Sequence, residues 1–330
     1  MDDNMSDLEK KILCNYSLNN TSLPLKISNN GVITLDYKLV REENMQVPGN
    51  DFEGWAIAAR ICSESDVKLD VKGIENFPND GYVGHGHLNR FLYRAMKFNE
   101  QYEWFGLSDE LNSRVEAFYN YLNDKSRVFV NNVPTKEAGN TYKIYDENAV
   151  EDKMSKDGVL KNILKNVGDG KVYRQLPVGL FEKEKAKANA IFTYGKSAID
   201  LWNINDDTIN LIELKTKNPM LGIITEIFFY SNYIYDFITG KNGFNLIEVP
   251  KVSKESYLRG YNELYKAKKK ICRVCGIMLA DDEEKFHQIV NTDCLSILND
   301  NRNSNMKYDM KLYHCTINVD LTCTNSDLSI

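Results

Sequence analysis

The sequence predicts an α/β fold for the second half of the chain, preceded by an α+β N-terminal region. Two observations predict this fold class: β-rich runs bounded by turn residues, and apolar residues at helical spacing between those runs. The composition fits a folded chain, since 42% of the 330 residues are hydrophobic and no Pro- or Gly-rich linker interrupts them. This length allows two domains, which we expect at residues 1–146 and 147–330.

The first 146 residues are expected to form an accessory domain of unknown role. Gly31–Val40 and Trp55–Val71 alternate in the manner of strands, which predicts an antiparallel sheet. Gly86–Phe98 and Ser108–Leu122 have helical spacing, and Ser108 is a suitable N-cap for the second helix. The sequence of this region contains no helix-turn-helix or zinc-finger signature.

The second half predicts the order helix, strand, hairpin, helix. Val150–Asn166 has helical spacing, and Val172–Phe181 is rich in strand-forming residues. Ala198–Trp202 and Ile209–Lys215 flank a polar turn and indicate an antiparallel hairpin. Met220–Ile238 is apolar, but it contains acidic and amide side chains that would be costly inside a bilayer, so a core helix is favoured over a membrane span.

The predicted hairpin brings two acids and a lysine together. A turn centred between Asp206 and Asp207 places Asp200 opposite Glu213, with Cβ atoms roughly 5 Å apart. Glu213 and Lys215 lie two residues apart on one strand and therefore share a face. The plain alternative is an exposed hairpin with ordinary surface charges, and spacing alone does not decide between the two.

Three charged groups in this arrangement suit a hard divalent cation. Two facing carboxylates repel each other unless they are neutralised, and Mg²⁺ is typically bound by one or two carboxylates together with water and substrate phosphate oxygens. The adjacent lysine could stabilise charge that develops on a phosphate. The pattern therefore indicates metal-dependent phosphodiester chemistry, with Mg²⁺ as the expected cofactor and Mn²⁺ as a substitute.

This pattern resembles the core of the PD-(D/E)XK, or restriction-endonuclease-like, nuclease superfamily. Asp200 corresponds to the acid on one strand, and Glu213-Leu214-Lys215 to the (D/E)-x-K on the next. The proline that usually precedes the first acid is replaced by Ile199. The resemblance extends from near residue 147 to residue 317. It implies an α/β restriction-endonuclease-like core, a mixed central sheet flanked by helices.

The resemblance also implies a role for each site residue. Asp200 and Glu213 would bind the metal with help from the Leu214 carbonyl, and Lys215 would be the catalytic lysine. The extra acid that many family members carry on the preceding helix is best matched by Glu151, with Glu147 as the second choice. Glu226 and Tyr230 stand where many members carry Gln-x-x-x-Tyr, on one face of the following helix.

A nucleic-acid ligand needs local positive charge, because the net charge of the chain is −6. Two basic clusters could supply it, although a run of charges is more often a solvated surface. They comprise Lys183, Lys185, Lys187 and Lys196, and Lys266, Lys268, Lys269, Lys270 and Arg273.

The cysteines and histidines give weaker signals. Seven cysteines, an odd number, fit reduced thiols and a cytoplasmic location, and no signal peptide is evident. Cys272 and Cys275 form a CxxC, with His287 and Cys294 as conceivable further zinc ligands, but we expect both cysteines on a buried core strand without metal. The Gly84–His87 segment is expected to lead into a helix.

The sequence thus predicts a metal-dependent nuclease that acts on nucleic acid, with DNA favoured over RNA. A role in phage defence or restriction and a homodimeric assembly are both compatible with it, and no membrane partner is expected. The alternative is a non-catalytic nucleic-acid-binding or assembly protein that keeps the nuclease fold.

Overall fold

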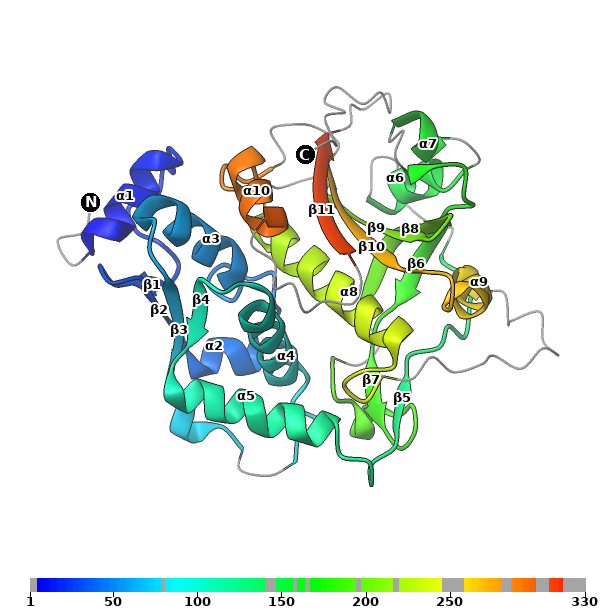
Figure 1. Cartoon of the computed structure of the whole chain (residues 1–330), viewed down its shortest axis with the longest axis horizontal. Coiled ribbons are helices and arrows are strands. Elements are labelled where there is room, and N and C mark those ends of the chain that lie inside the picture. Colours follow the sequence, from blue (N-terminus) through cyan, green and yellow to red (C-terminus); the bar gives the residue numbers. More distant parts are fainter. Residues whose placement is uncertain are drawn as a thin grey trace.

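In the computed structural model the chain is a mixed α/β protein whose sheets are flanked by helices (Figure 1). Its strands form a four-stranded sheet, a five-stranded sheet and a two-stranded sheet in the part of the chain that the structure describes. That part comprises residues 5–78, 81–139, 147–156, 159–163, 167–193, 197–215, 220–244, 258–280, 286–300 and 309–316.

The N-terminal region is built on the four-stranded sheet, in the order β1-β2-β3-β4. β1 and β2 are antiparallel, whereas β2, β3 and β4 run parallel. The elements are α1 (Asp7–Asn15), β1 (Lys26–Ile27), β2 (Val32–Asp36), α2 (Tyr37–Glu42), α3 (Phe52–Ser63), β3 (Val67–Lys72), a 3₁₀ turn (Ile74–Asn76), α4 (Gly86–Gln101), β4 (Phe105–Leu107) and α5 (Asp109–Leu122).

Two expectations for this region were wrong. The expected strand Trp55–Val71 is a helix, α3, up to Ser63, and only its last part is strand. α3 is apolar on nearly every side because it packs against α1, α8, α10 and β3, so its sequence lacks the polar face that would reveal a helix. The sheet is mostly parallel because α2 and α3 form the connection that crosses from β2 to β3.

Other expectations for this region are confirmed. The expected strand Gly31–Val40 exists as β2, although it gives way to α2 at Tyr37. Both predicted helices form, as α4 and α5. Ser108 caps α5, since its hydroxyl accepts the N–H of Leu111 at 3.4 Å. Of the Gly84–His87 segment, Gly84 and His85 precede α4 as expected, whereas Gly86 and His87 already belong to its first turn.

The second half is built on the five-stranded sheet, in the order β11-β10-β9-β8-β6. β10 runs parallel to β9 and β11, while β8 is antiparallel to β9 and β6. Its strands are β6 (Tyr173–Pro177), β8 (Ala198–Asn205), β9 (Thr208–Lys215), β10 (Arg273–Ala280) and β11 (Asp309–Thr316). A separate antiparallel pair joins β5 (Phe129–Asn131) to β7 (Leu180–Glu182).

The hairpin has the expected register. β8 and β9 pair from Asn205 with Thr208 to Leu201 with Ile212, as a turn centred between Asp206 and Asp207 requires. The paired positions end there, so the predicted facing pair, Asp200 and Glu213, lies just beyond the ladder. Asp206 has a φ of 53°, a left-handed conformation that is common for Asp in tight turns.

Helices cover the five-stranded sheet. They are α6 (Glu147–Met154), α7 (Val159–Ile163), α8 (Gly222–Thr239), α9 (Tyr261–Ala267) and α10 (Thr292–Asp300), with a 3₁₀ turn at Lys187–Asn189. The single helix expected over Val150–Asn166 is divided between α6 and α7, and parts of that span lie outside the described residues. The expected strand Val172–Phe181 is likewise interrupted, at Val178 and Gly179.

α8 lies between the N-terminal region and the five-stranded sheet (Figure 1) and is buried from Gly222 to Phe237. It packs on β9 and β10 on one side and on α3 and α4 on the other. Two glycines permit this close contact. A Cβ at Gly54 would lie 2.5 Å from Leu221, and one at Gly222 would lie 2.8 Å from the Gln46 Cα. Among the described residues no helix is long and apolar enough to span a membrane.

One large hydrophobic core contains residues of both the N-terminal region and the five-stranded sheet. A second, smaller core fills the opposite face of that sheet, beneath α6 and α7. It consists of Met154, Leu160, Val167, Leu201, Ile212, Leu214, Ile277 and Leu279.

Two buried ion pairs lie where the N-terminal region meets α8: Glu53–Arg94, between α3 and α4, and Lys97–Asp236, between α4 and α8. Arg94 forms a two-point contact with Glu53, at 2.7 and 2.9 Å, and the hydroxyl of Thr225 in α8 donates to the same carboxylate at 2.8 Å. Lys97 donates to Asp236 of α8 at 3.0 Å. The other oxygen of Asp236 accepts from Tyr93 at 2.7 Å and from Asn242 at 2.8 Å.

The CxxC does not lie wholly on a buried strand, and that expectation was wrong for Cys272. Cys272 is exposed and lies immediately before β10. Its N–H donates to the Asp207 carbonyl, which places it beside the hairpin turn. Its thiol also contacts the Asp207 carboxylate, at 2.8 Å. Cys275 is half-buried within β10.

Candidate active site

The hairpin carries the predicted residues to one end of the five-stranded sheet. Asp200 lies in β8, and Glu213 and Lys215 lie in β9. One oxygen of Asp200, Oδ2, accepts the backbone N–H of Leu214 at 2.9 Å. The Asp200 carboxylate is therefore fixed beside the main-chain segment between Glu213 and Lys215. The proposed role of the Leu214 carbonyl as a metal ligand stays a prediction.

Lys215 stands between two glutamates. Its ammonium lies 2.9 Å from Oε1 of Glu213 and 2.8 Å from Oε2 of Glu226. Burial on its own lowers the pKa of Lys215, but the charges of Glu213, Glu226 and Asp200 outweigh this effect and raise the pKa above its ordinary value. Lys215 is therefore held as a cation in a closed site, where its side chain is 9% exposed.

The two predicted metal ligands are both poorly compensated. Burial, followed by the charges of Asp200 and Glu226, raises the pKa of Glu213 well above the ordinary glutamate value. Burial likewise raises the pKa of Asp200, and the charges of Glu151 and Glu147 add to this while Lys215 opposes it. Oε2 of Glu213 is buried and has no hydrogen-bond partner among the described residues.

α8 brings the predicted Glu226 and Tyr230 to the site. Glu226 contacts Lys215 directly, as described above. Tyr230 is 3% exposed, and its pKa is raised well above normal by burial and by the charges of Glu226, Glu213 and Asp200. Its phenol is thus a neutral hydrogen-bond donor at the margin of the acid cluster.

Glu151 reaches the site from α6, as the resemblance implies. Its carboxylate accepts from the Arg174 guanidinium at 3.2 and 3.3 Å and from Gln175 Nε2 at 3.2 Å. Burial raises its pKa, which Arg174 opposes. Glu147, the second choice, lies in the first turn of α6, and its charge acts on both Asp200 and Lys215.

Gln175 marks a break in the sheet beside the site. It has a φ of 53°, and the pairing of β6 with β8 passes from Arg174–Leu201 to Leu176–Ile199 without it. The kink directs its amide to Asn148 at 2.9 Å as well as to Glu151. Strained backbone of this kind is common where a side chain must be held at a functional site.

Sequence reasoning missed three residues: Arg174, Gln175 and Arg90. The first two lie in the predicted strand, where alternation indicates burial but gives no partner. Arg90 comes from α4 in the N-terminal region and is 3% exposed. It donates to Ser197 at 3.0 Å, and its charge acts on Tyr230 and Glu226. No short-range pattern could have connected Arg90 to residues more than one hundred positions away.

The donor set fits a hard divalent cation. Four buried or half-buried acids, Asp200, Glu213, Glu226 and Glu151, surround two cations, Lys215 and Arg174. This excess of negative charge, with an orphaned carboxylate oxygen on Glu213, would be relieved by a cation bound through oxygen atoms. In the described part of the chain no group of three or more His, Cys, Asp or Glu side chains is arranged to hold a metal, so such a site would rely on the two predicted carboxylates with water and substrate oxygens.

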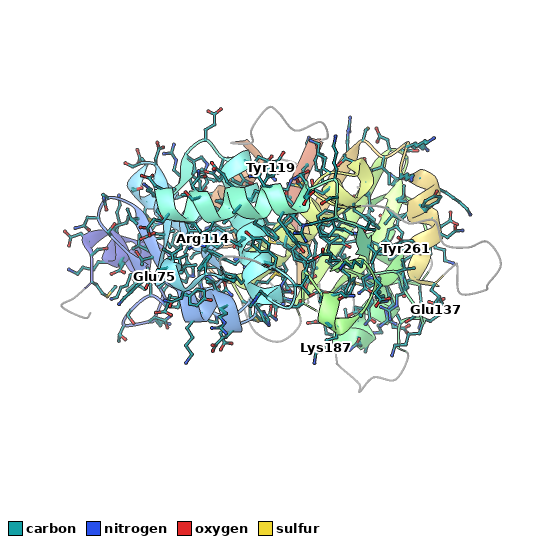
Figure 2. The ribbon with its side chains drawn as sticks, turned by 90° about the horizontal axis from the view of Figure 1, so that it is seen from below. Glu75, Arg114, Tyr119, Glu137, Lys187 and Tyr261 are labelled. Atoms are coloured by element: carbon teal, nitrogen blue, oxygen red, sulfur yellow. The ribbon has the colours of Figure 1, made fainter. Side chains whose placement is uncertain are left out.

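Both basic clusters belong to the second half of the chain, but the second one lies at the hairpin-turn end of the five-stranded sheet. There Arg273 pairs with Thr208, whereas Lys215 pairs with Ala280 at the other end. Lys183, Lys185 and Lys187 are exposed next to β7, while Lys196 lies outside the described residues. In Figure 2, Lys187 lies right of centre on the lower edge of the molecule, whereas Glu75 of the N-terminal region lies toward the left end. The second cluster begins at Lys266 in the last turn of α9 and ends at Arg273, the first residue of β10; Lys266, Lys269 and Lys270 are exposed.

Comparisons of the chain with protein-family models, with curated proteins and with solved structures found no match. The geometry of the site is therefore the basis for assigning a function.

Proposed function

We propose that the protein hydrolyses phosphodiester bonds of nucleic acid in a Mg²⁺-dependent reaction, and that its second half is a restriction-endonuclease-like core. The observation that carries this proposal is the buried excess of carboxylates around a single lysine. A cluster of this composition is unfavourable in the absence of a ligand, which is typical of a site built to bind a cation and a polyanion.

The arrangement of elements supports the same proposal. α6, β6, the β8–β9 hairpin and α8 occur in the order that the PD-(D/E)XK resemblance implies, and each supplies a residue to the site. β10 lies parallel to β9 at the centre of the sheet. Strand ends and loops at one edge of an α/β sheet are frequent positions for ligand sites.

Each side chain then has a role in the proposed reaction. Asp200 and Glu213 would hold Mg²⁺, which would supply Lewis-acid stabilisation of the phosphate when bound. Lys215 places its positive charge where the phosphate becomes more negative in the transition state, and Glu226 and Glu213 fix its position. Glu151, held by Arg174 and Gln175, adds negative charge next to Asp200.

DNA is the preferred substrate in this proposal, and the lysine clusters next to β7 and after α9 would contact its backbone. Such contacts are independent of sequence and weaken as salt rises. Substitution of Lys268, Lys269 and Lys270 should reduce affinity and flatten its salt dependence while leaving the rate of cleavage at saturation unchanged.

The test is to incubate the purified protein with plasmid, linear DNA and RNA, with Mg²⁺, Mn²⁺ or EDTA. We expect cleavage with either metal and none with EDTA. Lys215→Ala should abolish most cleavage with little change in affinity, because its interaction is made mainly in the transition state. Lys10→Ala, which alters an exposed lysine of α1, is the matched control and should cleave normally.

The alternative, a binding or assembly protein that keeps the fold, predicts another outcome. Salt-sensitive binding without hydrolysis on any substrate or metal, together with no effect of Lys215→Ala, would favour it over the nuclease.

A further inference from the structure

A cavity of about 350 Å³ lies between the N-terminal region and the start of α8. Its volume falls at the lower end of the range for small-molecule sites, roughly 300–1,000 Å³. The rim is formed by exposed polar residues near Asn20, and the floor by buried side chains. The lining residues that matter here are Leu23, Gln46, Asp51, Trp55, Leu221 and His287.

Asp51 places a carboxyl group in this cavity although the residue is 3% exposed. Its Oδ1 accepts the N–H of Gly49 at 2.8 Å and the indole N–H of Trp55 at 3.1 Å. No Lys, Arg or His side chain of the described segments forms an ion pair with it. Burial, assisted by the nearby charge of Glu53, raises the pKa of Asp51 to about 7. A buried carboxyl group without a cation is an unusual and costly feature.

Aromatic and aliphatic side chains form part of the cavity wall. The ring of Trp55 meets the ring of His287 edge-on, with centroids 6.0 Å apart and planes at 78°. His287 is neutral at physiological pH, since burial lowers its pKa to about 4. Its Nδ1 accepts the N–H of Ile289 at 3.3 Å, which places the ring proton on Nε2. Leu23 and Leu221 complete the floor.

These features define the ligand by its chemistry. The Asp51 carboxylate needs a cationic partner with N–H donors, and the aromatic and aliphatic walls need a compact apolar body. We propose that this cavity binds a small organic cation, an amidinium or primary ammonium group on a flat apolar body, with the charged group on Asp51. The site is separate from the carboxylate cluster and does not depend on the proposed nuclease activity.

The position of the cavity connects it to α8. Leu221 precedes the first residue of the helix that carries Glu226. Glu53, two residues after Asp51, accepts a hydrogen bond from Thr225, the residue before Glu226. A ligand on Asp51 would therefore contact the end of the helix that forms one wall of the carboxylate site.

Benzamidine is a suitable probe because it joins an amidinium group to a flat ring, and benzamide is its uncharged counterpart. We expect titration calorimetry on the full chain to show saturable binding of benzamidine with a dissociation constant near or below about 1 mM, and much weaker binding of benzamide. The fluorescence of Trp55 should change along the same binding curve. Trp55→Phe should remove that change, which distinguishes this cavity from the surroundings of the other tryptophans.

Asp51→Asn is the decisive variant. The amide oxygen of Asn can still accept from Gly49 and Trp55, so the fold should be retained, whereas affinity for benzamidine should fall roughly tenfold or more as the charge-assisted contact is lost. Asp66→Asn is the matched control, because Asp66 is an exposed acid outside the cavity lining. It should bind benzamidine as the parent chain does.

Three results would overturn the proposal: no saturable binding of benzamidine, equal affinity for benzamide, or an affinity that Asp51→Asn leaves unchanged. A blocked arginine, N-acetyl-arginine methylamide, tests whether the cation comes from a peptide instead. If this compound binds and benzamidine does not, the proposal that the cavity binds a small free organic cation is wrong. Nuclease assays play no part in these outcomes, so the two proposals can fail separately.

Discussion

Two sets of buried charges in this molecule differ in how they are compensated. In the pairs Glu53–Arg94 and Lys97–Asp236, every carboxylate oxygen accepts a hydrogen bond and each acid faces one cation. At the end of the hairpin, several acids share Lys215, and an oxygen of Glu213 has no partner among the described residues. Glu53, Arg94, Lys97 and Asp236 are buried, as are Glu213, Lys215 and Glu226 of the second set, whereas Asp200 is half-buried.

The difference distinguishes buried charges that stabilise the fold from buried charges that serve binding or catalysis. A balanced buried pair is costly to break and holds elements together, as Glu53 and Arg94 hold α3, α4 and α8. An unbalanced cluster lowers stability unless a ligand completes it, so its retention indicates binding or catalysis. Substitution in each set should therefore change stability in opposite directions.

The largest effect is expected in the balanced set. Glu53→Gln leaves the Arg94 guanidinium buried without its anion and should lower the free energy of unfolding by about 3–5 kcal/mol. Urea unfolding followed by circular dichroism measures this change. The exposed Glu110→Gln in α5 is the control, and a loss below 1 kcal/mol for Glu53→Gln would contradict the structural role.

The second largest effect is expected on the rate of cleavage when Lys215, at the centre of the unbalanced cluster, is substituted. Lys215→Met removes the charge but keeps a linear apolar side chain, and it should reduce the rate of cleavage roughly 10²–10³-fold, the cost of removing one charge-stabilising group. Single-turnover cleavage of a labelled duplex measures the rate. If the rate fell only because binding failed, saturating protein would restore it, and the proposed role of Lys215 would be wrong.

A third prediction uses the pH dependence of stability through Asp51. Its pKa is raised from 3.8 to about 7, so the folded state holds the proton more tightly and this group lowers stability as pH rises from about 4 to 7. Asp51→Asn lacks this titration, so the variant should gain stability over the parent between pH 5 and pH 8, by an amount of order 1–4 kcal/mol. Thermal unfolding at both pH values checks this, and a constant difference would exclude it.

The smallest expected effect is on the free energy of unfolding when the carboxylate cluster has no metal bound. In EDTA, Glu213→Gln removes a buried, poorly compensated acid and should raise the free energy of unfolding by about 1–3 kcal/mol. Mg²⁺ should then raise the melting temperature of the parent chain but not that of the variant, since only the parent gains from binding. Destabilisation by Glu213→Gln in EDTA would place Glu213 with the structural pairs.

The sequence predicted those parts of the fold and site that depend on local pattern. Alternation and turn residues were enough for the β8–β9 register, because a hairpin register follows from its turn. Spacing placed Asp200, Glu213 and Lys215 together because all three lie within one hairpin. The helical spacing of α8 was recognisable even though the helix is buried on every side.

The rest depends on contacts between distant residues. α3 was mistaken for a strand because burial on all sides erased its polar face. The role of Arg90 comes from α4 packing against α8, and that of Gln175 from a kink that alternation does not reveal. The cavity at Asp51 likewise exists only where separate segments meet.

The absence of a side chain at Gly54 and Gly222 has a practical consequence for how this chain can be divided. These glycines let α3 and the start of α8 approach so closely that the N-terminal region covers one whole side of α8. A protein that began at residue 147 would expose Phe228, which contacts Phe98 and Tyr102, and Phe229, which contacts Tyr93. Such a fragment should aggregate when expressed alone, and the hairpin with its acids would have to be studied in the intact chain.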